Sequence, residues 1–253
     1  MSYSIRPLYF APILKSLAGT DEKVHAIVYK RCNFNCNFCT IHLRPQEEFQ
    51  EYSEDEFVVV ASQLIRLGKS FKFTGGEPTL NPTILRDTQI IKDLGGRVFL
   101  DTNGSIPIVV NSLIRKKLVD LISVSLKGLS ATSARRISNC KNVRLCWSNV
   151  LDTIRLSLEN DIKTIVTYVF DSTSDFKTLC DFVDLFDEYG NIIFKINNLY
   201  YEELIGRDLK KVQEEVLLNN VKRLVEQKPQ LKNRIVLSLK EESVNEYSSI
   251  IFL

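Results

Sequence analysis

Long hydrophobic runs and net charge are both scarce in this 253-residue sequence. Its apolar stretches are short, as at residues 57–61, and fall well below the roughly 18 residues that a membrane-spanning helix needs. The 33 Lys and Arg residues nearly balance the 31 Asp and Glu residues, which leaves a formal net charge of +2. We therefore expect no membrane segment and no nucleic-acid partner.

A secretory signal is also not visible in the first part of the chain. Residues 1–23 carry Arg6 and Lys15 inside their apolar part, which interrupts the core that a signal peptide needs. The six cysteines are therefore expected in a reducing compartment, and we expect the cytoplasm. In that setting clustered cysteines indicate a metal site rather than disulfide bonds.

Strand and helix signals alternate along the chain from residue 24 onward. Near-continuous apolar runs predict strands over 24–30, 70–74, 97–101, 121–126, 163–170 and 192–196. Helices are predicted over 53–68, 81–95, 106–117, 145–158, 174–189 and 209–227. Ser53 and Glu56 form a capping box, and Asn81 is the expected N-cap of the second helix, with Pro82 at its first position. Residues 130–142 are expected to be irregular, and 234–239 to be a seventh strand or a packed tail.

Six strand–helix units with apolar strands indicate an α/β fold of parallel strands covered by helices. Such a sheet is either a barrel, complete or partial, or an open doubly wound sheet, and six units are too few for an eight-stranded barrel. No linker or shift in composition divides the chain. We predict one domain over 1–253, with a core of about 24–227 and terminal extensions 1–23 and 228–253.

Polar and glycine-rich segments follow the predicted strands. They are the cysteine loop 30–39, GGEP at 75–78, DTNG at 101–104, SLKG at 125–128, the turn at Asp171 and NNLYY at 197–201. Because the loops after parallel strands share one face of the sheet, we expect the active site there.

Three cysteines, Cys32, Cys36 and Cys39, have the spacing CxxxCxxC. Three thiolates are one short of the four that close an ordinary [4Fe–4S] cluster, so one iron stays open to another ligand. A structural zinc site is the alternative, because His42 follows closely and completes a Cys₃His set. The cluster is favoured, since zinc sites usually close with two separated ligand pairs. Phe38 would shield the cluster or face its ligand.

Gly75, Gly76 and Glu77 follow the second predicted strand. Adjacent glycines let the backbone approach a ligand closely, although a simple strand-to-helix turn is the alternative. Glu77 favours a ligand, because a carboxylate opposite the cysteine loop suits an ammonium group.

These two motifs resemble the signature of the radical S-adenosylmethionine superfamily, CxxxCxΦC followed by GGE, and the resemblance covers about residues 24–200. It implies a partial (β/α)₆ TIM-like barrel. It also implies that a [4Fe–4S] cluster on Cys32, Cys36 and Cys39 binds S-adenosylmethionine, and that an electron cleaves it to a 5′-deoxyadenosyl radical that abstracts hydrogen from a substrate. A flavodoxin or ferredoxin is the expected reductant.

The DTNG and SLKG loops look most like those of the glycyl-radical-enzyme activating group. That likeness implies that Thr102 and Asn103 contact the methionyl or ribose end of the cofactor and that Lys127 pairs with its carboxylate. The alternative for Lys127 is a strand-end lysine that reaches solvent. We also expect Ser125 among the cofactor-binding residues. At this position, two residues before the lysine, pyruvate formate-lyase activases have an acidic residue. The histidine expected after the sixth strand is missing, and so are the DGPG and QGEG segments of related groups.

The predicted function is therefore a radical enzyme that acts on a glycine of a partner protein. A peptide-modifying enzyme and a 7-carboxy-7-deazaguanine synthase-like enzyme are alternatives, and a zinc-binding or electron-transfer module is the alternative outside the class. Cys180 lies in an apolar helix and is expected in the core. Cys140 or Cys146 could donate a hydrogen atom. The basic residues Lys30, Arg31 and Arg44 could help dock an acidic reductant.

Overall fold

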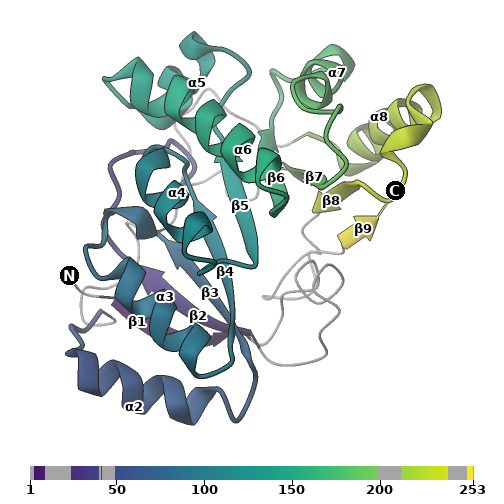
Figure 1. Ribbon diagram of the computed structural model, residues 1–253. Helices are drawn as coiled ribbons and strands as arrows, with labels where there is room; N and C mark the ends of the chain where they lie inside the picture. Colours follow the sequence, from purple (N-terminus) through teal and green to yellow (C-terminus); the bar gives the residue numbers. More distant parts are fainter. Residues whose placement is uncertain are drawn as a thin grey trace.

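A nine-stranded sheet forms the centre of the structure (Figure 1). The computed structural model describes residues 3–8, 24–39, 41, 49–198, 212–238 and 250–252. The strands lie in the sheet in sequence order, β2 to β8 run parallel, and the edge strands β1 and β9 are antiparallel to their neighbours. The strands are β1 (Tyr3–Leu8), β2 (Val24–Tyr29), β3 (Ser70–Gly75), β4 (Arg97–Thr102), β5 (Leu121–Leu126), β6 (Lys163–Phe170), β7 (Ile192–Asn198), β8 (Ile235–Ser238) and β9 (Ile250–Phe252).

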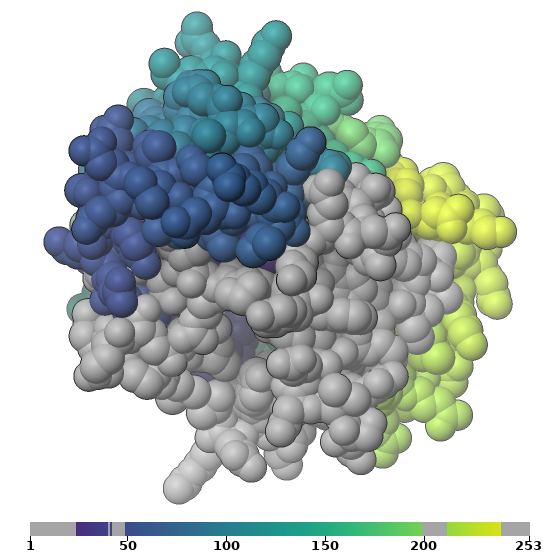
Figure 2. Space-filling view, turned by 90° about the horizontal axis from the view of Figure 1, so that it is seen from below, coloured from purple at the N-terminus to yellow at the C-terminus, as the bar shows by residue number. Residues whose placement is uncertain are grey.

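Helices follow one another around the outer side of this sheet (Figure 1). They are α2 (Glu54–Leu64), α3 (Ile84–Asp93), α4 (Pro107–Arg115), α5 (Ala131–Ser138), α6 (Asn149–Glu159), α7 (Phe176–Asp184) and α8 (Glu214–Gln227). The view from below shows the residues around α2 and those of α8 on opposite sides of the molecule (Figure 2). Within the described ranges, none of the helices combines the length and the apolarity that crossing a membrane requires.

The predicted fold class, a partial (β/α) barrel, is confirmed. Parallel strands in sequential order with their helices outside are the arrangement of a barrel wall. A doubly wound sheet, the alternative, reverses its strand order at a switch point and is excluded by this order. The sheet has one parallel strand more than the six predicted, because residues 235–238 form β8 beside β7. The tail alternative for this segment was wrong.

Both terminal regions contribute strands that the sequence did not predict. In the first region β1 pairs with β2 along its whole length, from Tyr3 opposite Tyr29 to Leu8 opposite Val24. In the last region β9 pairs with β8. The two edges of the parallel sheet are therefore each covered by an antiparallel strand.

Local capping decides where the first helices begin. The capping box before α2 is confirmed, because the Ser53 hydroxyl accepts from the Glu56 N–H and the Glu56 carboxylate accepts from the Ser53 N–H at 2.8 Å. The expected start of the next helix at Asn81 was wrong, since α3 begins at Ile84. Asn81 Oδ1 instead accepts from the N–H and the hydroxyl of Thr83, both at 3.2 Å, and forms a turn before the helix.

The segment expected to be irregular, 130–142, contains the helix α5. Ser130 caps it by accepting from the Ser133 N–H, and the helix ends at Asn139, which has a φ of 49°. A π-helical turn, Arg144–Ser148, then leads directly into α6. The sequence signal was weak because the helix has only 8 residues and its capping pair is Ser–Ser instead of Ser–Glu.

The two faces of the sheet differ in polarity. On β5 the side chains of Ile122, Val124 and Leu126 belong to the main apolar core beneath the helices. The half-buried Ser123 and Ser125 alternate with them and therefore lie on the inner face, because successive side chains of a strand point to opposite sides. The inner face is thus polar toward the carboxyl ends of the strands, where the functional loops begin.

Candidate active site

The cysteine loop follows β2 and rests on the end of α5. The N–H groups of Asn35 and Asn37 donate to the carbonyls of Ser138 and Ile137 at 3.0 and 3.1 Å. The Asn139 amide donates back to the Asn35 carbonyl at 2.8 Å. Thus a helix that sequence reasoning missed supports the loop that carries the three cysteines.

The three thiols are half-buried within this one loop. Cys32 and Cys36 pack with Phe34, Cys140 and Cys146, whereas Cys39 packs against Ala26 and Val28 on β2 and their neighbours Ile41 and Phe49. Cys36 interacts electrostatically with both Cys32 and Cys39. The structure therefore brings the three sulfurs of the motif into one neighbourhood.

The electrostatics of these thiols favour their protonated form. Burial raises the pKa of Cys32 to about 11, and the charges of Glu77 and Cys36 act in the same direction. Burial also raises the pKa of Cys36, against the attraction of the Lys127 ammonium. Ionised sulfurs here need a bound cation beside them, which is the behaviour expected of metal ligands in an apolar pocket.

The two glycines of GGEP contact the protein's own backbone. Gly75 has a φ of 101°, and a Cβ there would lie 2.4 Å from the Tyr29 carbonyl oxygen. A Cβ on Gly76 would lie 2.2 Å from the Arg31 carbonyl oxygen. The Gly76 N–H donates to the Tyr29 carbonyl at 2.6 Å, and the Glu77 N–H donates to the Arg31 carbonyl at 2.8 Å. Glycine is thus required where this loop is joined to the start of the cysteine loop.

Glu77 is turned into the protein and is 1% exposed. Its carboxylate accepts from the Thr79 hydroxyl at 2.6 Å, the Thr102 hydroxyl at 2.7 Å and the Asn103 N–H at 2.6 Å. Burial raises its pKa, while these donors stabilise the ionised form. The side chain that the sequence suggested as an ammonium ligand therefore joins the GGEP loop to the TNG loop.

Asn103 links the TNG loop to the cysteines. Its amide nitrogen lies 3.6 Å from Cys32 Sγ and donates to Asn33 Oδ1 at 2.9 Å. The Asn33 amide in turn donates to the Ser105 hydroxyl at 2.9 Å. Loops after β2, β3 and β4 are therefore one hydrogen-bonded unit, which runs from Glu77 through Asn103 to Cys32.

Lys127 lies on the other side of the cysteine loop. Its Nζ is 5.1 Å from the centroid of the Phe38 ring, in a cation–π contact. Both side chains line a small hollow of about 30 Å³, together with Tyr168 and Asp171. Ser125 lies on the inner face of β5, two residues before Lys127. Of the residues that the sequence singled out, Phe38, Glu77, Asn103 and Lys127 thus lie around the cysteine loop, and Ser125 makes no hydrogen bond to them among the described residues.

An ion pair on the inner face was not predicted. Lys72 Nζ lies 2.9 Å from Asp101 Oδ2, which also accepts from the Thr74 hydroxyl at 2.8 Å. Burial would raise the pKa of Asp101, but Lys72 and Thr74 outweigh it and lower the pKa to about 2. The signal that could have found this pair is a charged residue in the middle of an apolar strand, as in SFKFT.

No group of three His, Cys, Asp or Glu side chains in the described part of the chain is arranged around one metal ion. A four-iron cluster takes its thiolates on different irons and so holds them further apart than one ion does. His42, the fourth ligand of the zinc alternative, and Arg44 lie outside the described residues.

Parallel strands in barrel order with a three-cysteine loop at the first carboxyl end define a class of metal-cluster enzymes. The family model of the Radical SAM superfamily matches residues 26–186. This chain belongs to that superfamily, whose members are enzymes that bind a [4Fe–4S] cluster and S-adenosylmethionine.

Similar proteins include members with different activities. A probable GTP 3′,8-cyclase of Sulfurisphaera tokodaii is 30% identical over 130 residues, which are 50% of this chain and 41% of the relative. A putative glycyl-radical enzyme activating enzyme of Methanocaldococcus jannaschii is 27% identical over 138 residues, 53% of this chain and 50% of the relative. The matches span half or less of the length of these relatives.

SuiB of Streptococcus suis, solved with its precursor peptide SuiA, shares the fold. It has a TM-score of 0.65 and 18% identity, over 81% of this chain and 46% of SuiB. SuiB has also been solved with bound S-adenosylmethionine. At this identity the likeness concerns the fold alone.

Proposed function

We propose that this protein is a radical S-adenosylmethionine enzyme whose cluster is held by Cys32, Cys36 and Cys39. The observation that carries the proposal is the hydrogen-bonded unit that joins this loop to GGEP and TNG. The donor set also fits, since three soft thiol ligands lie in an apolar setting that suits an iron–sulfur cluster. When bound and reduced, the cluster and S-adenosylmethionine supply a 5′-deoxyadenosyl radical, which abstracts hydrogen.

The remaining predicted residues would position the cofactor. Lys127 offers a point charge for a carboxylate, and it already lies within electrostatic reach of Cys36. Asn103 and Thr102 are kept in place by Glu77, which we regard as a positioning residue because its carboxylate is saturated by protein donors. Gly75 and Gly76 let the GGEP loop lie against the start of the cysteine loop, and Phe38 would shield one side of the cluster.

Release of 5′-deoxyadenosine tests this function. Anaerobically reconstituted protein with dithionite and S-adenosylmethionine is expected to form 5′-deoxyadenosine and methionine in equal amounts, measured by liquid chromatography. Absence of both products from a preparation that holds a full [4Fe–4S] cluster would refute the proposal.

For the substrate we propose a protein or peptide. Support comes from two directions: SuiB binds a precursor peptide, and a relative is named as a putative glycyl-radical enzyme activating enzyme. The similarity to GTP 3′,8-cyclases favours a small-molecule substrate as the second candidate. A glycyl radical seen by electron paramagnetic resonance in a co-purified partner would select the activase, and consumption of GTP would select the cyclase.

We further propose that an acidic electron-carrier protein docks on α5. A hollow of about 500 Å³ is lined by Arg135, Arg136 and Lys141, with no acidic residue among its lining residues. Cys140 lines the same hollow and packs with Cys36 in the apolar cluster. A negatively charged donor bound there would lie close to the proposed iron–sulfur cluster.

The six cysteines are free thiols, which supports a reducing, cytoplasmic location.

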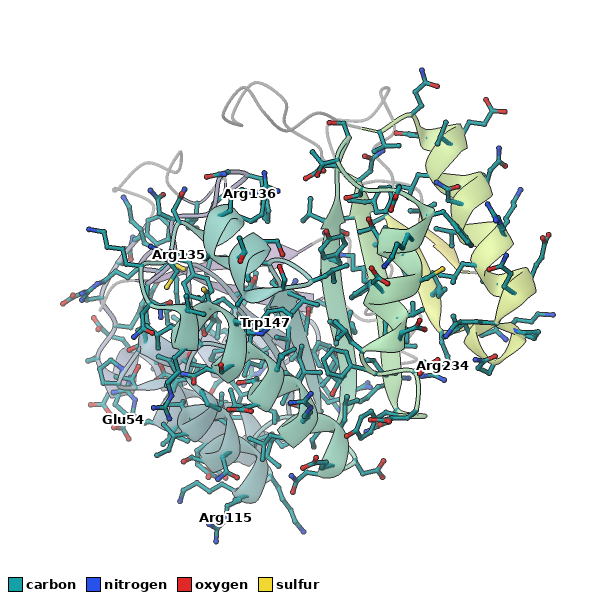
Figure 3. The ribbon with its side chains drawn as sticks, turned by 90° about the horizontal axis from the view of Figure 1, so that it is seen from above. Glu54, Arg115, Arg135, Arg136, Trp147 and Arg234 are labelled. Atoms are coloured by element: carbon teal, nitrogen blue, oxygen red, sulfur yellow. The ribbon has the colours of Figure 1, made fainter. Side chains whose placement is uncertain are left out.

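Charge reversal at this hollow separates donor docking from chemistry. The double variant Arg135→Glu and Lys141→Glu is expected to slow 5′-deoxyadenosine formation with a flavodoxin donor by about tenfold at low salt, because steering is lost. With dithionite, a small reductant, the rate should match the wild type. The matched control is Arg115→Glu. Arg115 is an exposed residue at the bottom of the view in Figure 3, far from Arg135 and Arg136 near the top, and its replacement should leave both rates unchanged. An equal loss with both reductants would contradict the docking site.

A further inference from the structure

Among the residues that the structure describes, Lys195 on β7 has no counter-ion of its own. It is half-buried, and within the described part of the chain its ammonium makes no hydrogen bond or ion pair. It interacts electrostatically with Lys72 and Asp101. Asp101, however, is already bonded to Lys72 and to Thr74. These three side chains together carry one net positive charge on the inner face of the sheet.

The surroundings of Lys195 disfavour its charged form. Burial, and then repulsion from Lys72, lower the pKa of Lys195 to about 8, against the attraction of Asp101. Other charged side chains on the inner face are few. Within the described strands, β2, β5 and β8 carry none there, β6 carries only the exposed Lys163 at its first position, and β4 carries the half-buried Arg97 at its first position besides Asp101. A partly buried cation of this kind is stabilised by an anion placed beside it.

Hydroxyl groups stand beside Lys195 in the same row of the sheet. The register places Ser125 of β5 next to Thr167 of β6, and Thr167 next to Lys195. Both hydroxyls are half-buried and, among the described residues, make no hydrogen bond. Two positions further along β7, on the same face, the buried Asn197 Oδ1 also lacks a partner there. An ammonium, two hydroxyls and a free amide oxygen thus lie along the inner wall.

We propose that Lys195, with Thr167 beside it and Ser125 one strand further along the same row, binds an oxyanion of the substrate, a carboxylate or a phosphate group. Ser125 is only two residues before Lys127, so the bound group lies next to the proposed cofactor site. Asn197 accepts a hydrogen bond from an N–H or O–H close to that oxyanion. The proposal deepens the proposed function by naming the substrate chemistry, but the binding itself needs no turnover.

Lysine titration by nuclear magnetic resonance tests the site without any reductant. Reconstituted, oxidised protein labelled with ¹³Cε-lysine is titrated with pH alone, with N-acetylglycine, with inorganic phosphate and with the neutral N-acetylglycinamide. We expect either anion to raise the pKa of Lys195 by at least about one unit. Because only the charged lysine binds, the affinity of the protein for the anion should fall about tenfold per pH unit above the pKa that Lys195 has without the anion. The neutral amide should cause no shift. The tighter anion identifies the group.

Variants assign the effect to this side chain. Lys195→Met should remove the titrating signal and weaken binding of the anions at least tenfold. Lys195→Arg should still bind the anions, and its affinity should no longer decline above pH 8. Binding by this variant would also show that the fold tolerates a substitution at this position. The control Lys222→Met, an exposed lysine of α8, should bind as the wild type. If the wild type binds neither anion, or if Lys195→Met binds both as well as the wild type, the proposal is wrong. Neither result decides whether the protein forms 5′-deoxyadenosine, so the proposed function is tested separately.

Discussion

Cys36→Ala is expected to abolish cluster binding and with it all radical chemistry. Cys36 is the central sulfur of the loop, since it interacts with Cys32, Cys39 and the Lys127 ammonium. Two remaining thiolates leave two irons of the cluster without protein ligands. We expect bound iron to fall to about a tenth of the wild type or less, and 5′-deoxyadenosine formation to below about a thousandth. Iron analysis and the visible absorbance of the cluster measure the first effect.

Two further cysteines make this experiment specific. Cys180→Ala is the matched control, because this half-buried thiol packs against the main core and is expected to keep iron and activity. Cys140 is the more demanding comparison, since it packs with Cys36 in the same apolar cluster. Cys140→Ala should also retain the cluster. A full four-iron cluster in Cys36→Ala would show that the proposed ligand set is wrong.

The loops of the site could be located from the sequence because their signals are local. An apolar run followed by a polar or glycine-rich loop marks the carboxyl end of a parallel strand, and the structure places Cys32, Glu77, Asn103 and Lys127 around one region. The partners of these residues were not local. Glu77 is saturated by Thr102 and Asn103, which lie 25 and 26 residues further along the chain. The sequence therefore identified Glu77 as a site residue, but we expected its carboxylate to bind a ligand's ammonium group rather than the TNG loop.

Elements that depend on distant packing were missed for the same reason. The helix α5 is short and gains its role by contact with the cysteine loop about 100 residues earlier, as in the Asn139 bond to Asn35 across 104 positions. β1 and β9 become strands by pairing with the edges of an existing sheet. The Lys72–Asp101 pair was overlooked because Lys72 lies within an apolar strand and Asp101 was assigned to the DTNG loop, so neither residue pointed to the other. In each case a contact between distant parts of the chain decides the local structure, and the periodicity of the sequence carries no information about such contacts.

Gly76→Ala is the second large effect, and its cause is steric. A Cβ at this position would lie 2.2 Å from the Arg31 carbonyl oxygen and 2.9 Å from that of Lys30, both of them backbone atoms that cannot move as a side chain does. The loop must shift, which breaks the bonds from the Gly76 and Glu77 N–H groups to β2 and the cysteine loop. We expect a loss of about 3 kcal/mol in the free energy of unfolding.

The same shift should impair chemistry beyond its effect on stability. Glu77 positions Asn103, so a displaced GGEP loop moves the TNG loop relative to Cys32, and about a hundredfold loss of 5′-deoxyadenosine formation is expected. The matched control is Gly190→Ala, where a Cβ meets no atom within 4 Å. Urea unfolding followed by circular dichroism compares the two variants. If Gly76→Ala is as stable and as active as Gly190→Ala, the two loops are not joined as the structure describes.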